Sequence, residues 1–136
     1  MTVIGSKSLA KKIKLPKTRS TIIEYRVFDH MRGIDFETLD DDLLLHRAVV
    51  GAARMAGMTC ENLDIHYYHP QGKSVTLIVS ASHIGIHTYP EKGFASVEIA
   101  VCKDFAGALK AYEYIRDILK PKYCEPNYHQ VEDEKR

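Results

Sequence analysis

Residues 80–91 bring hydroxyl groups, two imidazole rings and a carboxylate within twelve positions of the chain. They read Ser-Ala-Ser-His-Ile-Gly-Ile-His-Thr-Tyr-Pro-Glu, so histidines and hydroxyl residues lie within a largely apolar stretch. Hydroxyl groups act as nucleophiles, and imidazole groups move protons near neutral pH. His83 and His87 are four positions apart, and residues at that spacing share one face of a strand. We therefore expect both rings to face one pocket.

The turn at residues 90–93 sets the register with the strand that follows. If the two strands pair across this turn, Tyr89 faces Phe94 and His87 faces Ser96. The same register places Cys102 opposite Ala81. We therefore expect a thiol close to the peptide bond between residues 81 and 82, unless a bulge shifts the pairing.

This pattern resembles the signature of the small prokaryotic S-adenosylmethionine decarboxylase proenzymes, Glu-Ser-His-x-x-Ile-His-Thr-Trp-Pro-Glu, with a cysteine twenty residues after the serine. The matching residues are Ser82, His83, Ile86, His87, Thr88, Pro90, Glu91 and Cys102. The family's Phe-His-x-Phe-x-Pro-x-Gly-Val-Ser is echoed over residues 65–74, and its first-strand glutamate by Glu24, which precedes an aromatic. The resemblance covers residues 20–125.

The resemblance implies a self-processing, pyruvoyl-dependent decarboxylase. Ser82 Oγ would attack the carbonyl of Ala81, and β-elimination from the resulting ester would separate a beta chain, 1–81, from an alpha chain, 82–136. Ser82 would become a pyruvoyl group, whose ketone forms a Schiff base with the substrate amine and withdraws electrons as CO2 leaves. The expected activity is S-adenosylmethionine decarboxylation for spermidine biosynthesis, with neither PLP nor a metal.

The resemblance also assigns roles to single residues in processing and catalysis. His87 matches the histidine that moves a proton during processing, and Ser74 matches a serine that supports that step. Cys102 matches the acid that protonates the product carbon, a role that suits a thiol with an ordinary pKa near ~8.5.

A second group of residues is expected to bind substrate. Glu91 matches the carboxylate that accepts the ribose hydroxyls. Tyr68 and Tyr89 replace family aromatics that sandwich adenine or the sulfonium, and a tyrosine ring still offers stacking and cation–π attraction. The expected set is completed by Ile84, Ile86 and Glu24.

Departures from the family pattern leave the substrate open. Ala81 stands where the family has glutamate, and Lys73 and Val75 replace apolar and glycine residues beside Ser74. These changes allow an alternative with the same fold and cofactor that decarboxylates arginine or ornithine. A further alternative is an unprocessed homologue that acts as a binding or regulatory subunit. A zinc site on the histidines is disfavoured because paired cysteines and an HExxH motif are missing.

Hydrophobic periodicity predicts which segments form the strands and helices that carry these residues. The pattern predicts strands over residues 21–28, 63–68, 74–82, 84–89 and 94–102. It predicts one helix from the acidic residues 40–42 to Gly57, with Leu44, Ala48 and Ala52 in the core, and a second helix ending before Pro121. Consecutive strands with short turns form antiparallel sheets, so we expect an α+β two-layer sandwich with the helices on one face.

Composition sets the class of protein. The chain has 136 residues, 45% of them hydrophobic, and its 19 Lys+Arg against 18 Asp+Glu leave a net charge of +1. These values predict a single globular domain with no general affinity for nucleic acid. No apolar run approaches the ~20 residues of a membrane span, and three cysteines without close pairing favour free thiols in the cytoplasm.

The two ends of the chain are rich in charged residues. Residues 1–19 are strongly basic and are expected to form a flexible extension, and residues 126–136 are expected to form a charged tail. The family resemblance implies a homodimer with active sites near the subunit interface. The face expected to be shared carries Phe94, Ser96, Glu98, Ala100 and Cys102.

Overall fold

The computed structural model describes residues 20–134, which form one six-stranded sheet and its covering helices. The strands are β1 (Ser20–Arg32), β2 (Cys60–Tyr67), β3 (Lys73–Val79), β4 (Ser82–Tyr89), β5 (Phe94–Val101) and β6 (Asn127–Glu134). The helices are α2 (Phe36–Leu39), α3 (Asp42–Met55) and α4 (Phe105–Leu119), and a short 3-10 turn, η1 (Pro90–Lys92), joins β4 to β5.

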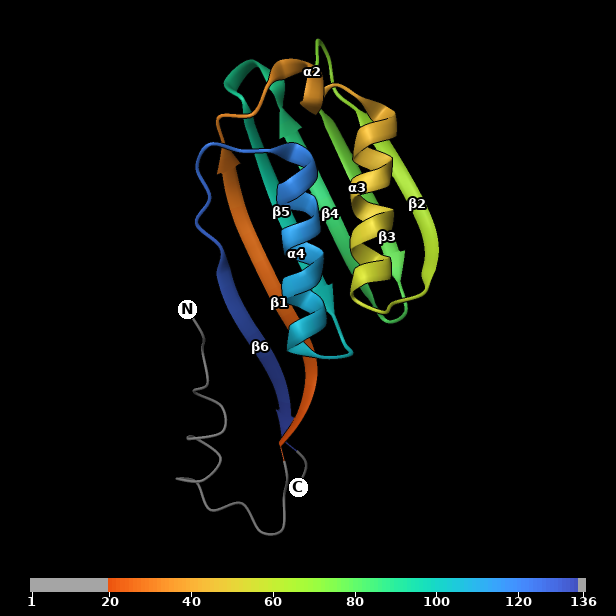
Figure 1. Ribbon diagram of the computed structural model, residues 1–136. Coiled ribbons are helices and arrows are strands. Elements are labelled where there is room, and N and C mark those ends of the chain that lie inside the picture. The colour runs from red at the N-terminus through yellow and green to blue at the C-terminus, as the bar shows by residue number, and fades with distance from the viewer. Residues whose placement is uncertain (1–19, 135–136) are drawn as a thin grey trace.

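The sheet has the order β2-β3-β4-β5-β1-β6, and every neighbouring pair is antiparallel. Helix α3 packs over β3 and β4, and α4 packs over β1 and β5, so both long helices cover the same face (Figure 1). The predicted α+β two-layer sandwich is confirmed. The other face of the sheet carries no helix among the described residues.

Side chains alternate between the two faces of the central strands, and those on one face form the apolar core between the sheet and the helices. Residues Val75, Leu77, Ile84, Ile86, Val97 and Ile99 point inward and are buried. Helix α3 contributes Leu45, Ala48, Val49, Ala52 and Ala53, so the predicted stripe is correct at Ala48 and Ala52, while Leu44 lies half-buried at its edge. Each fully buried aliphatic side chain contributes about 1.5–3 kcal/mol.

Both long helices begin where a carboxylate can accept a backbone hydrogen bond. Asp41 accepts from the Leu44 N–H at 3.1 Å, within the acidic run that predicted this start. Asp104 accepts from the Gly107 N–H at 2.6 Å. Such caps stabilise a helix by about 1 kcal/mol.

The C-terminal segment differs from the expectation. Residues 127–134 are not a tail, because they form β6 and pair with β1 from Asn127 opposite Phe28 to Glu134 opposite Ser20. The segment before β6 is anchored by the buried Asp29, which accepts hydrogen bonds from Tyr112 Oη at 2.6 Å and the Glu125 N–H at 2.9 Å. Backbone hydrogen bonds to the long strand β1 therefore hold β6 in place, although the side chains of β6 are strongly polar. The basic residues 1–19 lie outside the described residues.

Candidate active site

Strand β4 carries the central candidate residues and separates them onto two faces. Ile84, Ile86 and Thr88 are buried toward the helices, and this alternation turns His83, His87 and Tyr89 to the face without helices. The shared face of the two histidines is confirmed. The single pocket is not: His83 and His87 line different cavities.

The predicted register between β4 and β5 is also confirmed. Tyr89 pairs with Phe94 and His87 with Ser96. Beyond the last pair, the Cys102 thiol lies 3.6 Å from the carbonyl oxygen of Ser80, close to the peptide bond expected to be cleaved.

Ser82 is the first residue of β4 and lies directly after a two-residue turn. Its hydroxyl donates a hydrogen bond to Glu24 Oε2 at 2.6 Å. The other oxygen of Glu24 accepts from Arg26 Nε at 2.7 Å. A carboxylate in contact with a serine hydroxyl can take up its proton when the oxygen attacks a carbonyl. The structure thus brings Ser82, Glu24 and Cys102 to one end of the sheet, which we name the serine end.

The charge state of Glu24 follows from its surroundings. Partial burial raises the pKa of its carboxyl, but hydrogen bonds from Ser82 and Arg26 and the positive charge of Arg26 lower it by more. The net pKa lies below the ordinary value, so the group is ionised at neutral pH. The family pattern suggested substrate binding for Glu24. Its contact with Ser82 was not predicted, because the two residues are 58 positions apart.

The opposite end of β4 holds a second cluster, which we name the histidine end. Ser74 Oγ and His87 Nδ1 share a hydrogen bond of 2.7 Å, and Tyr68 Oη lies 2.9 Å from Ser74 Oγ. A cavity of about 370 Å³ opens here, and its lining includes five predicted site residues, Tyr68, Ser74, His87, Tyr89 and Glu91. Glu91 accepts a long hydrogen bond of 3.4 Å from Gln71. Rings, a carboxylate and a Ser–His pair therefore converge on one cavity.

The serine end and the histidine end are well separated within one chain. His87 follows Ser82 by five positions on the same strand. At a rise of about 3.3 Å per residue, their backbones lie roughly 16 Å apart. This separation could have been anticipated from the spacing of the two residues along a strand.

Ile84 and Ile86 have a different role from the one expected. Both side chains are 0% exposed and belong to the core between the sheet and the helices. They are not available for direct contact with a substrate and instead fix the position of β4. The reason is the alternation of β4: the even-numbered residues between the two histidines must face the helices.

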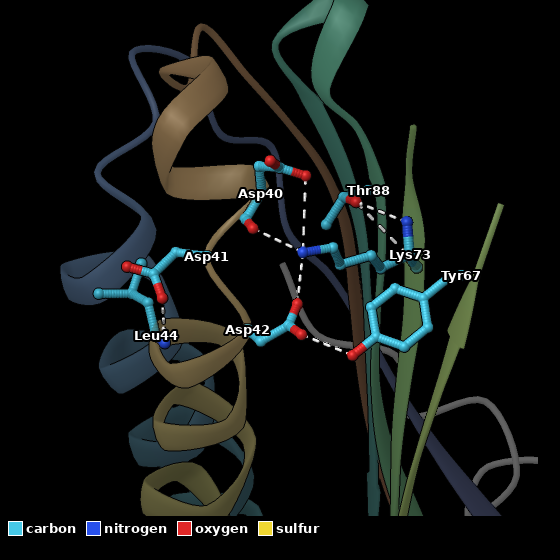
Figure 2. A network of polar contacts seen from close by, with 7 residues as sticks. All are labelled: Asp40, Asp41, Asp42, Leu44, Tyr67, Lys73 and Thr88. Carbon is cyan, nitrogen blue, oxygen red and sulfur yellow. Dashed lines mark hydrogen bonds and ion pairs between the residues drawn. The ribbon is translucent and has the colours of Figure 1, made fainter. Parts of the chain in front are cut away.

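Lys73 precedes Ser74 but points to the opposite face of the sheet. Figure 2 shows its side chain reaching the start of α3, where Nζ bonds the backbone oxygen of Asp40 at 2.5 Å and pairs with the carboxylate of Asp42. Tyr67 Oη donates to the same carboxylate at 2.5 Å. The Lys73 N–H donates to Thr88 Oγ1 at 2.9 Å. Lys73 precedes Ser74 and Thr88 follows His87, so this bond joins the two residues that adjoin the Ser74–His87 pair. Lys73 was expected to be a change near the substrate, and it does line the cavity, but its ammonium is bound to Asp40 and Asp42 at the start of α3.

The electrostatics of this network favour the ionised pair. Burial lowers the pKa of Lys73, but the hydrogen bond and charge of Asp42 and the charge of Asp40 raise it above the ordinary value overall. The hydrogen bonds from Lys73 and then Tyr67 lower the pKa of Asp42. Both groups are therefore charged across the neutral range.

Within residues 20–134, no three His, Cys, Asp or Glu side chains are grouped closely enough to hold a metal ion. The ring of His66 packs edge-on against the ring of Tyr68, with 4.7 Å between the ring centroids. None of the helices that the structure describes is long and apolar enough to cross a membrane.

Comparisons with known proteins agree with this arrangement. The S-adenosylmethionine decarboxylase proenzyme of Synechococcus sp. (strain WH7803) is 41% identical over 86 residues, which are 63% of this chain and 67% of that protein. An S-adenosylmethionine decarboxylase proenzyme 2 of Bacillus cereus is 39% identical over 89 residues, 65% of this chain and 72% of that protein.

A solved structure extends the likeness to three dimensions. The crystal structure of the adenosylmethionine decarboxylase from Aquifex aeolicus VF5 superposes with a TM-score of 0.76 at 28% identity, covering 85% of this chain and 98% of that one. The family model for S-adenosylmethionine decarboxylase matches residues 25–131, from β1 into β6. This chain therefore belongs to the S-adenosylmethionine decarboxylase family.

Proposed function

We propose that this protein is a pyruvoyl-dependent S-adenosylmethionine decarboxylase, a carboxy-lyase, made as a proenzyme that cleaves itself between Ala81 and Ser82. The observation that carries the proposal is the serine end. There a serine after a tight turn donates its hydroxyl to an ionised carboxylate, Glu24, while the Cys102 thiol lies against the same turn. The curated relatives carry the name proenzyme, which supports a processing step.

Within this proposal, each residue of the serine end has a separate chemical role. Ser82 Oγ is the nucleophile, and Glu24 is the nearest acceptor for its proton. Once formed from Ser82, a pyruvoyl group would supply the electron sink that loss of CO2 from an amino acid requires. Cys102 is proposed to return a proton to the product carbon, which its thiol contact with the Ser80 oxygen at 3.6 Å supports, and neither PLP nor a metal ion is part of the proposal.

The histidine end is proposed to bind the nucleoside part of the substrate and to assist processing. The Glu91 carboxylate can accept two ribose hydroxyls, and the half-exposed rings of Tyr68 and Tyr89 offer faces for adenine or a sulfonium. Ser74 and His87 share a hydrogen bond, so the ring can move a proton while the hydroxyl fixes its orientation.

A homodimer reconciles these roles with the separation of the two ends. Ser82 and His87 of one chain lie roughly 16 Å apart and cannot act on the same atoms. A second copy packed on the face without helices, with its strands reversed, can bring its histidine end to the serine end of the first copy. Exposed Phe28 and Ile78 on that face support burial in such an interface.

The names of the relatives favour S-adenosylmethionine over arginine or ornithine, because each reported relative is an S-adenosylmethionine decarboxylase. We further propose that the product serves spermidine biosynthesis and that the protein acts in the cytoplasm, without nucleic acid or membrane as partner.

Intact mass spectrometry and CO2 release test the proposal together. The purified protein should appear as two chains, 1–81 and 82–136, and the second should begin with a keto group that reacts with hydrazines. S-adenosylmethionine should release CO2, while arginine and ornithine should not. An unbroken 136-residue chain without a keto group would instead support the binding or regulatory alternative.

A further inference from the structure

The turn that joins β3 to β4 contains an unusual backbone conformation. Ser80 and Ala81 form the loop between the paired residues Val79 and Ser82. Ala81 has φ 63°, in the left-handed region. Among the described residues, the only other non-glycine residue with positive φ is Lys120, at φ 52°. Lys120 caps the C-terminal end of α4, where this conformation is common.

This conformation is unfavourable for alanine in two respects. The left-handed region brings Cβ too close to the following carbonyl oxygen, a penalty that glycine lacks. In addition, two-residue hairpin loops normally have positive φ at their first central residue, because that twist matches the flanking strands. Here only the second central residue, Ala81, has positive φ. The peptide bond expected to be cleaved therefore follows directly after a strained residue.

Contacts on both sides hold the turn in this state. The Ser80 N–H donates to the backbone oxygen of Thr59 at 3.1 Å, and the Cys102 thiol lies 3.6 Å from the Ser80 oxygen. On the other side, the Ser82 hydroxyl is bound to Glu24 at 2.6 Å. A strained conformation persists only where its surroundings over-determine it, and such sites cluster where strain serves function. Rotation of the peptide between Ser80 and Ala81 would break the Cys102 contact with the Ser80 oxygen, while the bonds of Ser80 N–H and of the Ser82 hydroxyl fix the chain on either side of it.

We infer that the left-handed Ala81 is a positioning residue for self-cleavage, and that release of its backbone strain speeds the first step. The inference rests on the proposed self-processing. In that step, Ser82 Oγ bonds to the Ala81 carbonyl carbon and the C–N bond between the two residues breaks. The hydroxyl proton passes through the Glu24 carboxylate to the released nitrogen. Ala81 is then no longer fixed by a peptide bond to β4, and its φ can leave the left-handed region.

The test compares Ala81→Gly with Lys120→Gly, a matched control at the other left-handed residue. Glycine removes the same steric penalty at both positions, but only position 81 adjoins the cleaved bond. The fraction of cut chain is measured by intact mass over time after rapid purification. Ala81→Gly should slow cleavage about fivefold, which corresponds to about 1 kcal/mol at 1.4 kcal/mol per tenfold change in rate. Lys120→Gly should cleave at the wild-type rate.

A second variant separates strain from flexibility. Asparagine tolerates the left-handed region but keeps a Cβ, so Ala81→Asn relieves strain without loosening the turn. It should also slow cleavage. A Ser82→Ala background keeps the chain intact, and there both Ala81→Gly and Lys120→Gly should raise the thermal midpoint relative to Ser82→Ala alone.

Three results would overturn the inference: an unchanged or faster rate for Ala81→Gly, a wild-type rate for Ala81→Asn, or equal slowing by Lys120→Gly. The last would mean that cleavage responds to overall stability. The failure of the proposed function looks different, because the wild-type protein itself would then remain uncut.

Discussion

At the level of single residues, the serine end works through a few short contacts. Ser82 has one carboxylate within hydrogen-bond distance, and that carboxylate is in turn held by Arg26. The pKa of Glu24 lies below its ordinary value, because hydrogen bonds from Ser82 and Arg26 outweigh the effect of burial. An ionised acceptor and an oriented hydroxyl favour attack on the neighbouring carbonyl.

Replacing Ser82 with alanine should leave a folded, uncut and inactive chain. The substitution removes only the hydroxyl group, and the core that supports β4 does not involve it. Circular dichroism should match the wild-type protein, while intact mass should show the full-length chain and no CO2 should be released. Cleavage of this variant at the same bond would contradict the role of Ser82.

Replacing Cys102 with alanine should separate processing from turnover. The thiol is proposed to protonate the product, so the variant should still be cut but lose at least about tenfold in kcat. Cys60→Ala is the matched control, because Cys60 is an exposed free cysteine whose thiol has no part in the proposal, although its backbone pairs with Val79 beside the same turn. The measurement is the ratio of cut chain to CO2 released, and wild-type turnover in Cys102→Ala would exclude the thiol as the acid.

At the level of elements, the Lys73 network ties the start of α3 to the start of β3. Its side chain is 9% exposed, and the ammonium bridges Asp40 and Asp42 across the two layers (Figure 2). The backbone of Lys73 also bonds to Thr88, which adjoins His87. The network thereby supports the Ser74–His87 pair from the side of the sheet that faces the helices.

Replacing Lys73 with methionine should remove a pH-dependent part of the stability. The pKa of Asp42 is lowered in the folded state, so the pair stabilises the fold above the ordinary carboxyl pKa and loses this contribution as the pH falls through the folded value. Because Asp42 is 42% exposed, solvent screens the pair, and we expect a loss of roughly 1 kcal/mol at neutral pH.

Urea unfolding in a Ser82→Ala background measures this effect on an intact chain. The difference in unfolding free energy between this background and the same protein carrying Lys73→Met should be largest near neutral pH and shrink as the solution is acidified below the ordinary carboxyl pKa. The exposed Lys110→Met is the control and should change stability little under either condition. A difference that stays constant on acidification would show that the ion pair does not contribute as described.

At the level of the whole molecule, the distance between the two ends of β4 is the main constraint. The serine end lies at the start of β4, and the cavity of the histidine end lies at the other end of that strand. The proposed reversed packing of two copies gives each active site residues from both chains.

Co-expression of Ser82→Ala with His87→Ala tests this shared site. In a mixed dimer, the His87→Ala chain retains Ser82, and the Ser82→Ala chain supplies His87 from across the interface. Neither variant should be cut when expressed alone, but a cut His87→Ala chain should appear in the mixture. Mixed dimers that form without any cut chain would place the action of His87 within its own protomer.

Several features of this protein follow from local chemistry and could be predicted from sequence. Alternation and helical periodicity are set by backbone geometry, so the two-layer sandwich and the pairing of His87 with Ser96 were correct. Both long helices also end where predicted, after Met55 and before Pro121. The motif from Ser82 to Cys102 spans one hairpin, and its family was therefore identifiable.

Other features depend on contacts between distant segments, which no local pattern encodes. Glu24 meets Ser82 across 58 positions, and Lys73 meets Asp42 across 31, only because the sheet and helix α3 bring them together. Strand β6 is strongly polar and pairs because β1 offers it a long free edge. The left-handed Ala81 persists because contacts from three other segments hold its turn. Long-range packing, which sequence periodicity does not describe, therefore determines which groups surround Ser82.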